Sequence, residues 1–444
     1  MNYRKIAVAA AALCMAIGAG AQTSGSTDES DSHNPLEFKR TSEEVRTILS
    51  RHRPTEAQSV PVPRFVVKSR NNSFIMAIGG VVNPIIGYDI GNNLYSCDGA
   101  GINFVTAAIP VPARSAHKGD FFINGINGNV DLQITGLAGT PNEISAYVKV
   151  GTNGINTQVA LKRAYITWKH FQMGRQQTLA QDPDACQPPT IDPQGPSGMI
   201  ATTVHEIAYK SPDYDGFRWA AALDMPTYYS SNGVYYGKDY PIYDGHQVDI
   251  SAEQYIPDIP AWAEYTFSPD NRIRLTGILR NFHYRDRVES KTRYTPGFGL
   301  ILSGNLRPVK PLLLYYQFAY GKGIGAYIQD LAGIPCSYTP DSKHPGRMKG
   351  TEMAGLTVGA TYEYSDRLQF NAMFSESRVW NVMEYATRQD NANYKYGLYG
   401  AVNAFYKITP YLTWGVEYLW GHRQTWTEGG AHDSRIQTQL AFHF

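Results

Sequence analysis

The sequence predicts an all-β protein, a transmembrane antiparallel up-and-down β-barrel of about sixteen strands. Three observations support this fold class. Segments in which apolar and polar residues alternate follow one another along most of the chain. Short turns and long loops take turns between these segments. The last segment is a strand with one apolar face and one polar face. In that strand, residues 435–444, Ile436, Leu440, Phe442 and Phe444 share one face and polar residues dominate the other. A wall between lipid and a wet lumen requires this pattern.

The first 21 residues have the pattern of a secretory signal peptide. Arg4 and Lys5 precede an apolar run over residues 6–18, and residues 19–21 are the small ones that a signal peptidase accepts before Gln22. The run is too short for a retained membrane helix. Beyond Gln22 no stretch of about 18 apolar residues occurs, which excludes a helical membrane protein.

Residues 22–72 predict a periplasmic N-terminal extension with one short helix. The segment TSEE at residues 41–44 is a capping box, and Pro54 ends the pattern. A helix near residues 42–52 has about three turns and needs a partner to bury its apolar face. It could dock under the barrel mouth or pair with copies in an oligomer, and a loosely ordered extension is the alternative.

The barrel itself is predicted over residues 73–444. The expected strands cover residues 73–91, 128–138, 143–151, 156–169, 171–178, 199–210, 216–225, 259–267, 271–285, 293–305, 311–323, 350–364, 368–381, 393–407, 411–425 and 432–444. An even number near sixteen suits a single-chain bacterial barrel that is wide enough for an aqueous channel.

The connections between these strands are sorted by length. Every second one is short and rich in turn residues, namely 139–142, 169–170, 211–213, 268–270, 365–367 and 408–410. The others include long insertions after Gly91, Thr178, Met225 and Lys322. Short turns at a periplasmic rim and long loops outside are typical of an outer-membrane barrel, whereas a soluble β-sandwich has no reason to sort its loops this way.

Alternation also orients the side chains of each strand. Arg272, Arg274 and Arg280 alternate with apolar neighbours on one strand, and a charge facing lipid near the midplane costs about 2–4 kcal/mol. These arginines are therefore expected to face the lumen. The same argument places further charged residues inside, namely Arg163, Glu264, Glu363 and Glu417.

The hairpin over residues 163–176 resembles the strand pair that precedes the constriction loop of porins. The proline-stiffened segment 179–198 follows it and carries Asp182, Asp184 and Asp192. We expect this segment to fold into the lumen, where its acids face a basic wall across the narrowest point and create a transverse field. The expected wall consists of Arg163, Arg175, Arg272, Arg274 and Arg280. Strict alternation would turn Arg175 outward unless a bulge intervenes.

A layout that begins at the end of this hairpin resembles the layout of the DcaP-like porins. It consists of Gly-Arg-Gln at residues 174–176, a loop, and Ile-Asp-Pro-Gln-Gly-Pro at residues 191–196 leading into a strand. The resemblance implies a trimeric sixteen-stranded barrel that passes small, often anionic or dicarboxylate solutes, with a periplasmic extension before the barrel. Glu264, Glu363 and Glu417 depart from an evenly basic pore, so ion selectivity stays open.

The last strand resembles the C-terminal strand of Gram-negative outer-membrane proteins, whose terminal Phe is read by the barrel-assembly machinery. The resemblance implies this role for Phe444. The expected function is an outer-membrane porin that sits in lipid as a homotrimer and passes small hydrophilic solutes. The alternative is a barrel whose long external loops act as a binding or adhesion platform.

Signals for other functions are weak. His205-Glu206 lacks the second His of a zinc motif, and no nucleophile elbow or phosphate loop has the right spacing, so no enzyme, metal or cofactor is expected. Lys and Arg number 40 against 39 Asp and Glu, which gives no basic field for nucleic acid. Three cysteines remain after the signal peptide, Cys97, Cys186 and Cys336. One pair, such as the last two, could form a disulfide, or all three could be unpaired.

Overall fold

The computed structural model describes most of the predicted barrel. The described residues are 49, 65–69, 73–92, 94, 101–113, 119–125, 127–153, 158–226, 250–253, 256–286, 290–332, 334, 336–341, 343–344, 347–380 and 394–444. The predicted signal peptide and Cys97 lie outside them, as does the predicted helix near residues 42–52 apart from Leu49. Leu49 is buried against Ile75 and Ala77, and its carbonyl accepts a hydrogen bond from Gln133 Nε2 at 2.9 Å.

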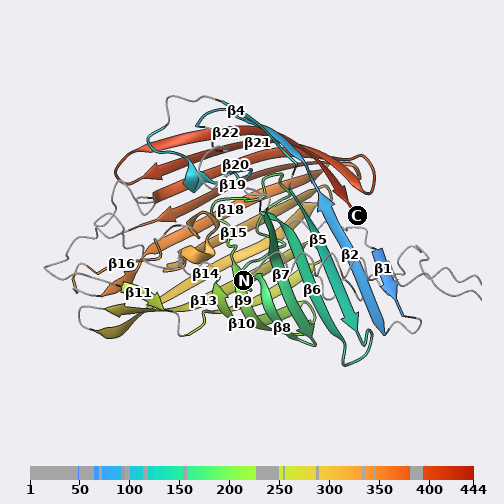
Figure 1. Ribbon diagram of the computed structural model, residues 1–444, viewed down its shortest axis with the longest axis horizontal. Helices are drawn as coiled ribbons and strands as arrows, with labels where there is room; N and C mark the ends of the chain where they lie inside the picture. Colours follow the sequence, from blue (N-terminus) through green and yellow to red (C-terminus); the bar gives the residue numbers. More distant parts are fainter. Residues whose placement is uncertain are drawn as a thin grey trace, which may run out of the picture. The chain divides into compact units, whose positions relative to one another are not determined.

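The described chain is dominated by strands, and most of them belong to one sheet (Figure 1). The strands are β1 (Phe65–Lys68), β2 (Phe74–Val82), β3 (Ile85–Asp89), β4 (Asp120–Asn124), β5 (Gly128–Gly136), β6 (Ile144–Asn153), β7 (Gln158–Trp168), β8 (Phe171–Gln177), β9 (Thr203–Lys210), β10 (Phe217–Pro226), β11 (Ile250–Glu253), β12 (Ile259–Ser268), β13 (Asn271–Asp286), β14 (Lys291–Val309), β15 (Leu312–Lys322), β16 (Tyr338–Pro340), β17 (Met348–Gly350), β18 (Glu352–Glu363), β19 (Leu368–Val379), β20 (Tyr394–Lys407), β21 (Leu412–Thr425) and β22 (Gly430–His443). Three short 3-10 helices, Thr106–Ala108, Gly325–Tyr327 and Gln329–Leu331, lie in the connections.

The sheet closes into a sixteen-stranded antiparallel barrel, which confirms the predicted fold class. Three of the sixteen crossings of the wall are interrupted and consist of two strands each, namely β2 with β3, β4 with β5, and β11 with β12. Each of the sixteen predicted segments contains an observed strand. The last strand, β22, pairs with β21 on one edge and with β2 and β3 on the other, which closes the wall. Beyond the end of β22, β1 takes over as the partner of β2, with Phe65 opposite Ile78.

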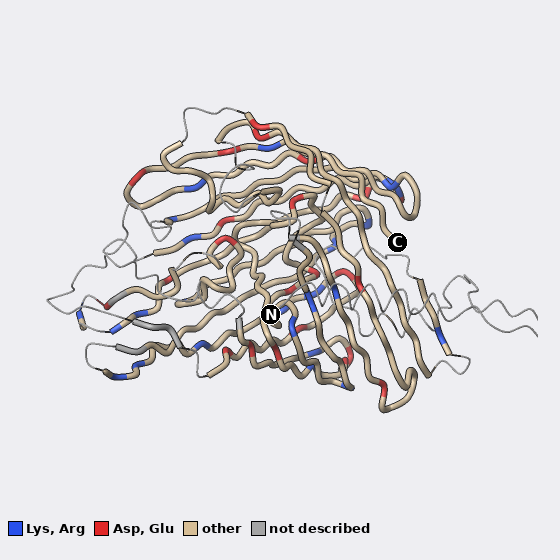
Figure 2. The backbone as a smooth tube through the Cα atoms, in the orientation of Figure 1, with Lys and Arg blue, Asp and Glu red and all other residues tan. Residues whose placement is uncertain are grey.

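The two faces of the wall differ as the alternation predicts. On β13, Leu275 and Leu279 are exposed on the outside, while Arg274 and Thr276 are buried on the inside. Lys, Arg, Asp and Glu are sparse along the long strands (Figure 2). An apolar outer face of this kind suits contact with lipid, because a bilayer offers no partner for charged groups. No helix among the described residues is long and apolar enough to span a membrane.

Turn length sorts the two ends of the barrel, as predicted. The turn between β7 and β8 has only two residues, and Lys169 adopts a positive φ of 53° there. We call this rim the short-turn end and the opposite rim the loop end. At the loop end, residues 178–202 and residues 323–337 each connect consecutive strands by a long path.

Three segments from the loop end fold inward and bind one another. We name them loop A (101–109), loop B (178–202) and loop C (323–332). Ala201 N donates to Tyr327 O at 2.9 Å, and Gln329 N donates to Met199 O at 2.8 Å, which joins loop B to loop C. Loop B also reaches the inner wall, because Ile200 N donates to Gln317 Oε1 on β15 at 2.6 Å. These contacts place loop B inside the barrel, as the sequence predicts for residues 179–198.

Candidate functional site

The interior contains a polar cavity of about 1090 Å³, which we call the central cavity. Loop B forms part of its lining through Asp184 and Asp192, and the rest comes from inward faces of the strands. Several lining residues, such as Asp270 and Lys407, flank short turns, so the cavity lies on the short-turn side of loop B. Asn and Gln side chains are frequent among the others.

Basic residues outnumber acidic ones around the central cavity. Five Lys or Arg residues line it against three acids, and the five are Lys149, Arg163, Arg218, Arg272 and Lys407. Strand alternation could have found Lys149, because it follows the inward Tyr147 by two residues on β6. Lys407 and Asp270 flank turns, where alternation ends, so no sequence pattern placed them at the cavity.

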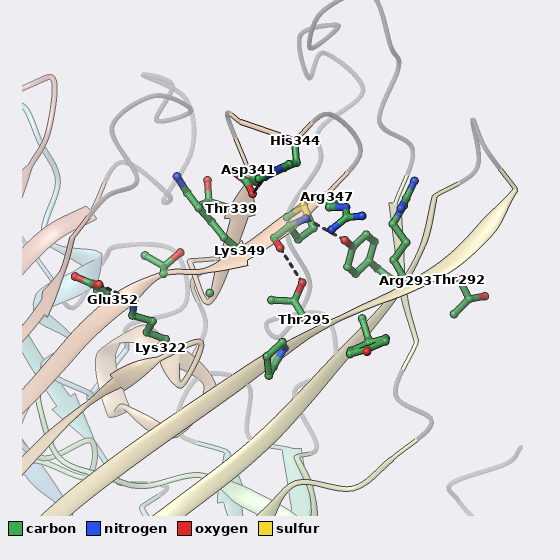
Figure 3. A pocket seen from close by; sticks show the side chains of 16 residues that line it. Thr292, Arg293, Thr295, Lys322, Thr339, Asp341, His344, Arg347, Lys349 and Glu352 are labelled. Atoms are coloured by element: carbon green, nitrogen blue, oxygen red, sulfur yellow. Dashed lines mark hydrogen bonds and ion pairs between the residues drawn. The ribbon is translucent and has the colours of Figure 1, made fainter.

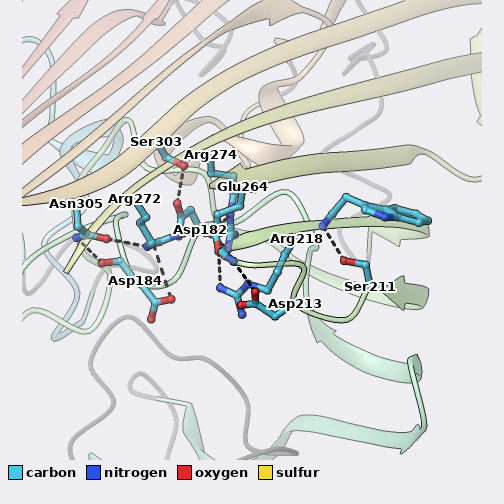
Figure 4. A network of polar contacts seen from close by, with 12 residues as sticks. Asp182, Asp184, Ser211, Asp213, Arg218, Glu264, Arg272, Arg274, Ser303 and Asn305 are labelled. Carbon is cyan, nitrogen blue, oxygen red and sulfur yellow. Dashed lines mark hydrogen bonds and ion pairs between the residues drawn. The ribbon is translucent and has the colours of Figure 1, made fainter. Parts of the chain in front are cut away.

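A buried ion-pair network joins loop B to β13 (Figure 4). Arg272 donates to Glu264 Oε2 at 2.5 Å and also binds Asp182, while Arg274 Nε donates to the same Glu264 oxygen at 2.8 Å. Asp182 Oδ2 accepts a further hydrogen bond from Ser303 Oγ at 2.6 Å. Every charge in this network therefore has an opposite partner, which burial requires.

This network corrects the predicted transverse field. The sequence argument placed the acids of loop B across open space from the basic wall, whereas Asp182 touches Arg272 and lies within 3.6 Å of Arg274. Burial acts to raise the pKa of Asp182, but the charges of Arg274 and Arg272 outweigh it and hold that pKa below its usual value. Asp184 stands farther off, 3.8 Å from Arg272, and burial raises its pKa.

The other predicted basic residues do not form one wall. Arg163 lines the central cavity, but Arg280 is buried away from its lining, where it donates to Asp258 Oδ2 at 2.9 Å and to Gly323 O. Arg175 pairs across the sheet with Ala164 and His205, which are on the outer face, and donates to Leu161 O at 3.3 Å. Its predicted place in the lumen is therefore wrong, because strict alternation holds at this position.

Glu417 on β21 fixes loop B to the inner wall. It accepts hydrogen bonds from Thr190 Oγ1 at 2.5 Å, Asp192 N at 3.0 Å and Ile191 N at 3.1 Å. Side chains of neighbouring strands complete its shell of donors. Glu363, another glutamate predicted inside, is half-exposed near a short turn and pairs with Arg307 at 3.3 Å. Only the first of these two glutamates therefore holds a loop.

Two buried acids hold the inward loops together. Asp192 of loop B accepts from Phe104 N of loop A at 3.0 Å and from Tyr399 OH at 3.1 Å; burial, with Glu417 adding to it, raises the pKa of Asp192 to about 7. Asp330 of loop C accepts from Ala107 N at 3.0 Å, and burial raises its pKa to about 6. Asp330 lies in a loop without periodicity, so the sequence offered no signal for it.

Metal and disulfide chemistry find no support in the described part of the chain. No group of three His, Cys, Asp or Glu residues there could hold a metal ion. Cys186 and Cys336 are both buried and free, and they belong to different apolar clusters. The suggested disulfide between them is therefore wrong. Burial raises the pKa of the Cys336 thiol to about 12.

Comparison with known proteins gives a likeness of structure only. No family model matches the chain, and no curated protein matches it in sequence. The outer membrane channel DcaP of Acinetobacter baumannii superimposes with a TM-score of 0.68, at 16% identity, over 85% of this chain and 99% of that one. The outer-membrane expressed OmpT of Vibrio cholerae gives 0.51 at 10% identity, over 85% and 100%. The chain therefore shares the sixteen-stranded barrel fold of Gram-negative outer-membrane channels, the DcaP channel among them, as its resemblance to the DcaP-like porins predicted.

Proposed function

We propose that this protein is a porin that forms a water-filled channel for small hydrophilic solutes across the outer membrane. One observation carries the proposal. A closed barrel with an apolar outer face encloses a polar, charged cavity of about 1090 Å³. A structural core would instead bury apolar side chains at this depth, because unpaired polar groups are costly there. The proposal assigns no catalytic activity to the chain.

Anionic solutes are the finer part of this proposal. Lys149, Arg163 and Lys407 are basic cavity residues from three different strands, and the lining has five basic residues against three acids. The ion pairs of Arg272 hold the loop instead of leaving its guanidinium to a solute. Selectivity would then come from the excess of basic over acidic residues in the lining as a whole, because a narrow passage screens charge little.

The assembly belongs to the same proposal. The protein would form a homotrimer surrounded by outer-membrane lipid, and Phe444 would be read by the barrel-assembly machinery. Phe444 lies at the seam, where its backbone exchanges two hydrogen bonds with Gly80, at 3.0 Å and 3.1 Å. Recognition of this residue would therefore act on the strand that closes the barrel.

Single-channel recording in a planar bilayer under a salt gradient tests the proposal. The refolded protein should open in three steps, with a reversal potential that shows anion preference. Cation preference would contradict the proposed selectivity for anions but would still support the proposed channel. No conductance from a demonstrably folded barrel would overturn the channel itself. Deletion of residues 180–197 should widen an existing pore.

One observation favours a second candidate, a barrel that serves as a binding platform. Loops A, B and C bind one another through backbone hydrogen bonds and buried acids, which narrows the loop end of the lumen. A platform would bind an extracellular ligand through its loops and would show no conductance with or without residues 180–197. The same recordings therefore separate the two candidates.

A further inference from the structure

A second cavity, of about 960 Å³, lies at the loop end of the barrel. We call it the rim pocket. It shares no lining residue with the central cavity. The pairing of β14 with β15 ends at Phe298 and Lys322, so residues 291–297 of β14 continue past the end of β15. The pocket occupies the notch that this overshoot leaves beside the β16–β17 hairpin.

The β16–β17 hairpin, which forms one wall of the rim pocket, is fixed to the barrel by hydrogen bonds. Thr295 Oγ1 on β14 donates to Met348 O at 2.7 Å, and Met348 N donates to Tyr284 OH at 3.0 Å. The hairpin thus binds the inner face of two barrel strands. A pocket with a rigid wall is better suited to a ligand than a gap between two free loops, because less order is lost on binding.

Positive charge dominates the lining. Four Lys or Arg residues face two acids there, namely Arg293, Lys322, Arg347 and Lys349 against Asp341 and Glu352. Both acids have partners within the pocket. Glu352 Oε1 lies 2.9 Å from Lys322 Nζ, and Asp341 Oδ2 lies 2.7 Å from His344 Nδ1. The lining therefore keeps a formal excess of two positive charges without counting the histidine.

The basic side chains lie in two places within the pocket. In Figure 3, Arg347 and Arg293 lie towards one side of the pocket, while Lys349 extends beside Thr339 on the other side. Thr339 and Lys349 are opposite each other in the hairpin pairing, which fixes this second position. A ligand with two separated anionic groups would meet a cation at each place.

Two buried hydroxyls of the lining provide an independent observation. Thr339 is 2% exposed and Thr351 is 1% exposed, and the hydroxyl oxygen of each has no hydrogen-bond partner among the described residues. A buried hydroxyl without a partner costs about 1–3 kcal/mol. Both threonines line the pocket, and a threonine hydroxyl can donate a hydrogen bond to an oxyanion.

We propose that the rim pocket binds a ligand carrying phosphate groups. Guanidinium and ammonium groups together with hydroxyls are the donors that phosphate oxygens prefer, and the cavity has the volume of a ligand site. Two sources fit this chemistry, a soluble phosphate-bearing compound and the headgroup of a membrane lipid. Tyr294 lines the pocket and is 70% exposed on the outer face, so the pocket reaches the outer face of the barrel wall.

Binding of pyrophosphate to the detergent-folded protein, measured by isothermal titration calorimetry, is the first test. The double variant R347Q/K349Q should bind at least about tenfold more weakly than the wild type, because two charge-assisted contacts are lost. The control is K343Q, which removes one positive charge from an exposed residue of the same loop outside the lining. Equal weakening in the control, or no binding to the wild type, would overturn the proposal.

A second arm identifies the source. Native mass spectrometry would compare retention of diphosphoryl lipid A with retention of its dephosphorylated form. Retention of the phosphorylated lipid that R347Q/K349Q abolishes supports the site with a lipid as ligand. Pyrophosphate binding without lipid retention supports it with a soluble ligand. The variant T339V/T351V keeps every charge and should bind pyrophosphate a few-fold more weakly; unchanged affinity would overturn the role of the hydroxyls.

This inference stands apart from the channel function. Both measurements use folded protein in detergent and require no conductance, so a barrel that conducts nothing would still give a result. Heat-modifiable mobility in gel electrophoresis verifies that each variant is folded. Failure of phosphate binding with normal conductance would leave the porin in place.

Discussion

Replacement of Glu417 by alanine should release the middle of loop B from the wall of the barrel. Three donors of loop B end on this carboxylate, the hydroxyl of Thr190 and the backbone amides of Ile191 and Asp192. Alanine removes all three contacts and leaves the rest of β21 unchanged. The other attachments of loop B, such as Gly198 N to Ser375 Oγ at 2.8 Å, remain in place.

The size of the effect follows from these contacts. A hydrogen bond to a charged group contributes about 1.5–3 kcal/mol, so the three together hold this stretch of loop B by about 4 kcal/mol or more. Since 1.4 kcal/mol is a factor of ten, the detached population should rise by about 1,000-fold. Residues 190–194 line the central cavity, so their detachment changes its width directly.

Single-channel recording measures this change. Glu417→Ala should show larger conductance and more current noise than the wild type. Glu363→Ala is the matched control, since that carboxylate is half-exposed near a short turn and pairs with Arg307 instead of a loop. Wild-type conductance and noise in a folded Glu417→Ala barrel would refute the reasoning.

Two further predictions concern stability, and a third concerns refolding. Arg272→Gln removes the cation shared by two buried carboxylates, Asp182 and Glu264, which keep only their contacts with Arg274 and Arg218, and should cost about 3–5 kcal/mol, seen as heat-modifiable unfolding at a lower temperature. The pKa of Asp192 is about 7 in the folded protein and exceeds its value in the unfolded chain. The free energy of unfolding should therefore fall by about 2–3 kcal/mol as pH rises from about 5 to 7, and then level off. Asp192→Asn should flatten this pH dependence, which the melting temperature measures. Gly80→Val should lower the refolding yield, because its Cβ would clash with the backbone oxygen of Asn129 and would lie 2.6 Å from Phe444 Cζ at the seam.

Each of these three predictions has a control or an outcome that would contradict it. Gly125→Val is the control for the seam, since nothing lies within 4 Å of a Cβ there, and equal yields in the two variants would contradict the steric argument. A melting temperature that rises with pH between 5 and 7 would contradict the sign derived for Asp192. An Arg272→Gln barrel as stable as the wild type would mean that Arg274, Arg218 and water satisfy the two carboxylates without Arg272.

The barrel could be predicted from sequence because its signal is local. Strand alternation has a period of two, so Arg274 and Leu275 reveal their faces without any knowledge of the neighbouring strand. The same rule correctly turned Arg175 outward where the analogy with a basic wall placed it inside. Breaks within a span were missed, as between β2 and β3 at Asn83 and Pro84, because a short interruption leaves the pattern on both sides intact.

The interior could not be predicted because its contacts join distant parts of the chain. Asp182 and Arg272 are 90 residues apart, and no local pattern states that they touch. Both residues were recognised as candidate site residues, but they were expected to face each other across open space and instead form an ion pair. Asp330 went unnoticed altogether, since an acid in a loop looks like any solvated charge until its donors on loop A are known.

The binding of loops A, B and C to one another also constrains the order of assembly. Thr106 and Asp330 are 224 residues apart, and Ile200 meets Ile328 across 128 residues, so these contacts gain nothing until the strands have brought the loops together. We therefore expect the newly closed wall to enclose a wider and wetter interior than the mature protein. On this view, assembly ends when the loops dock inward in a barrel whose wall is already closed.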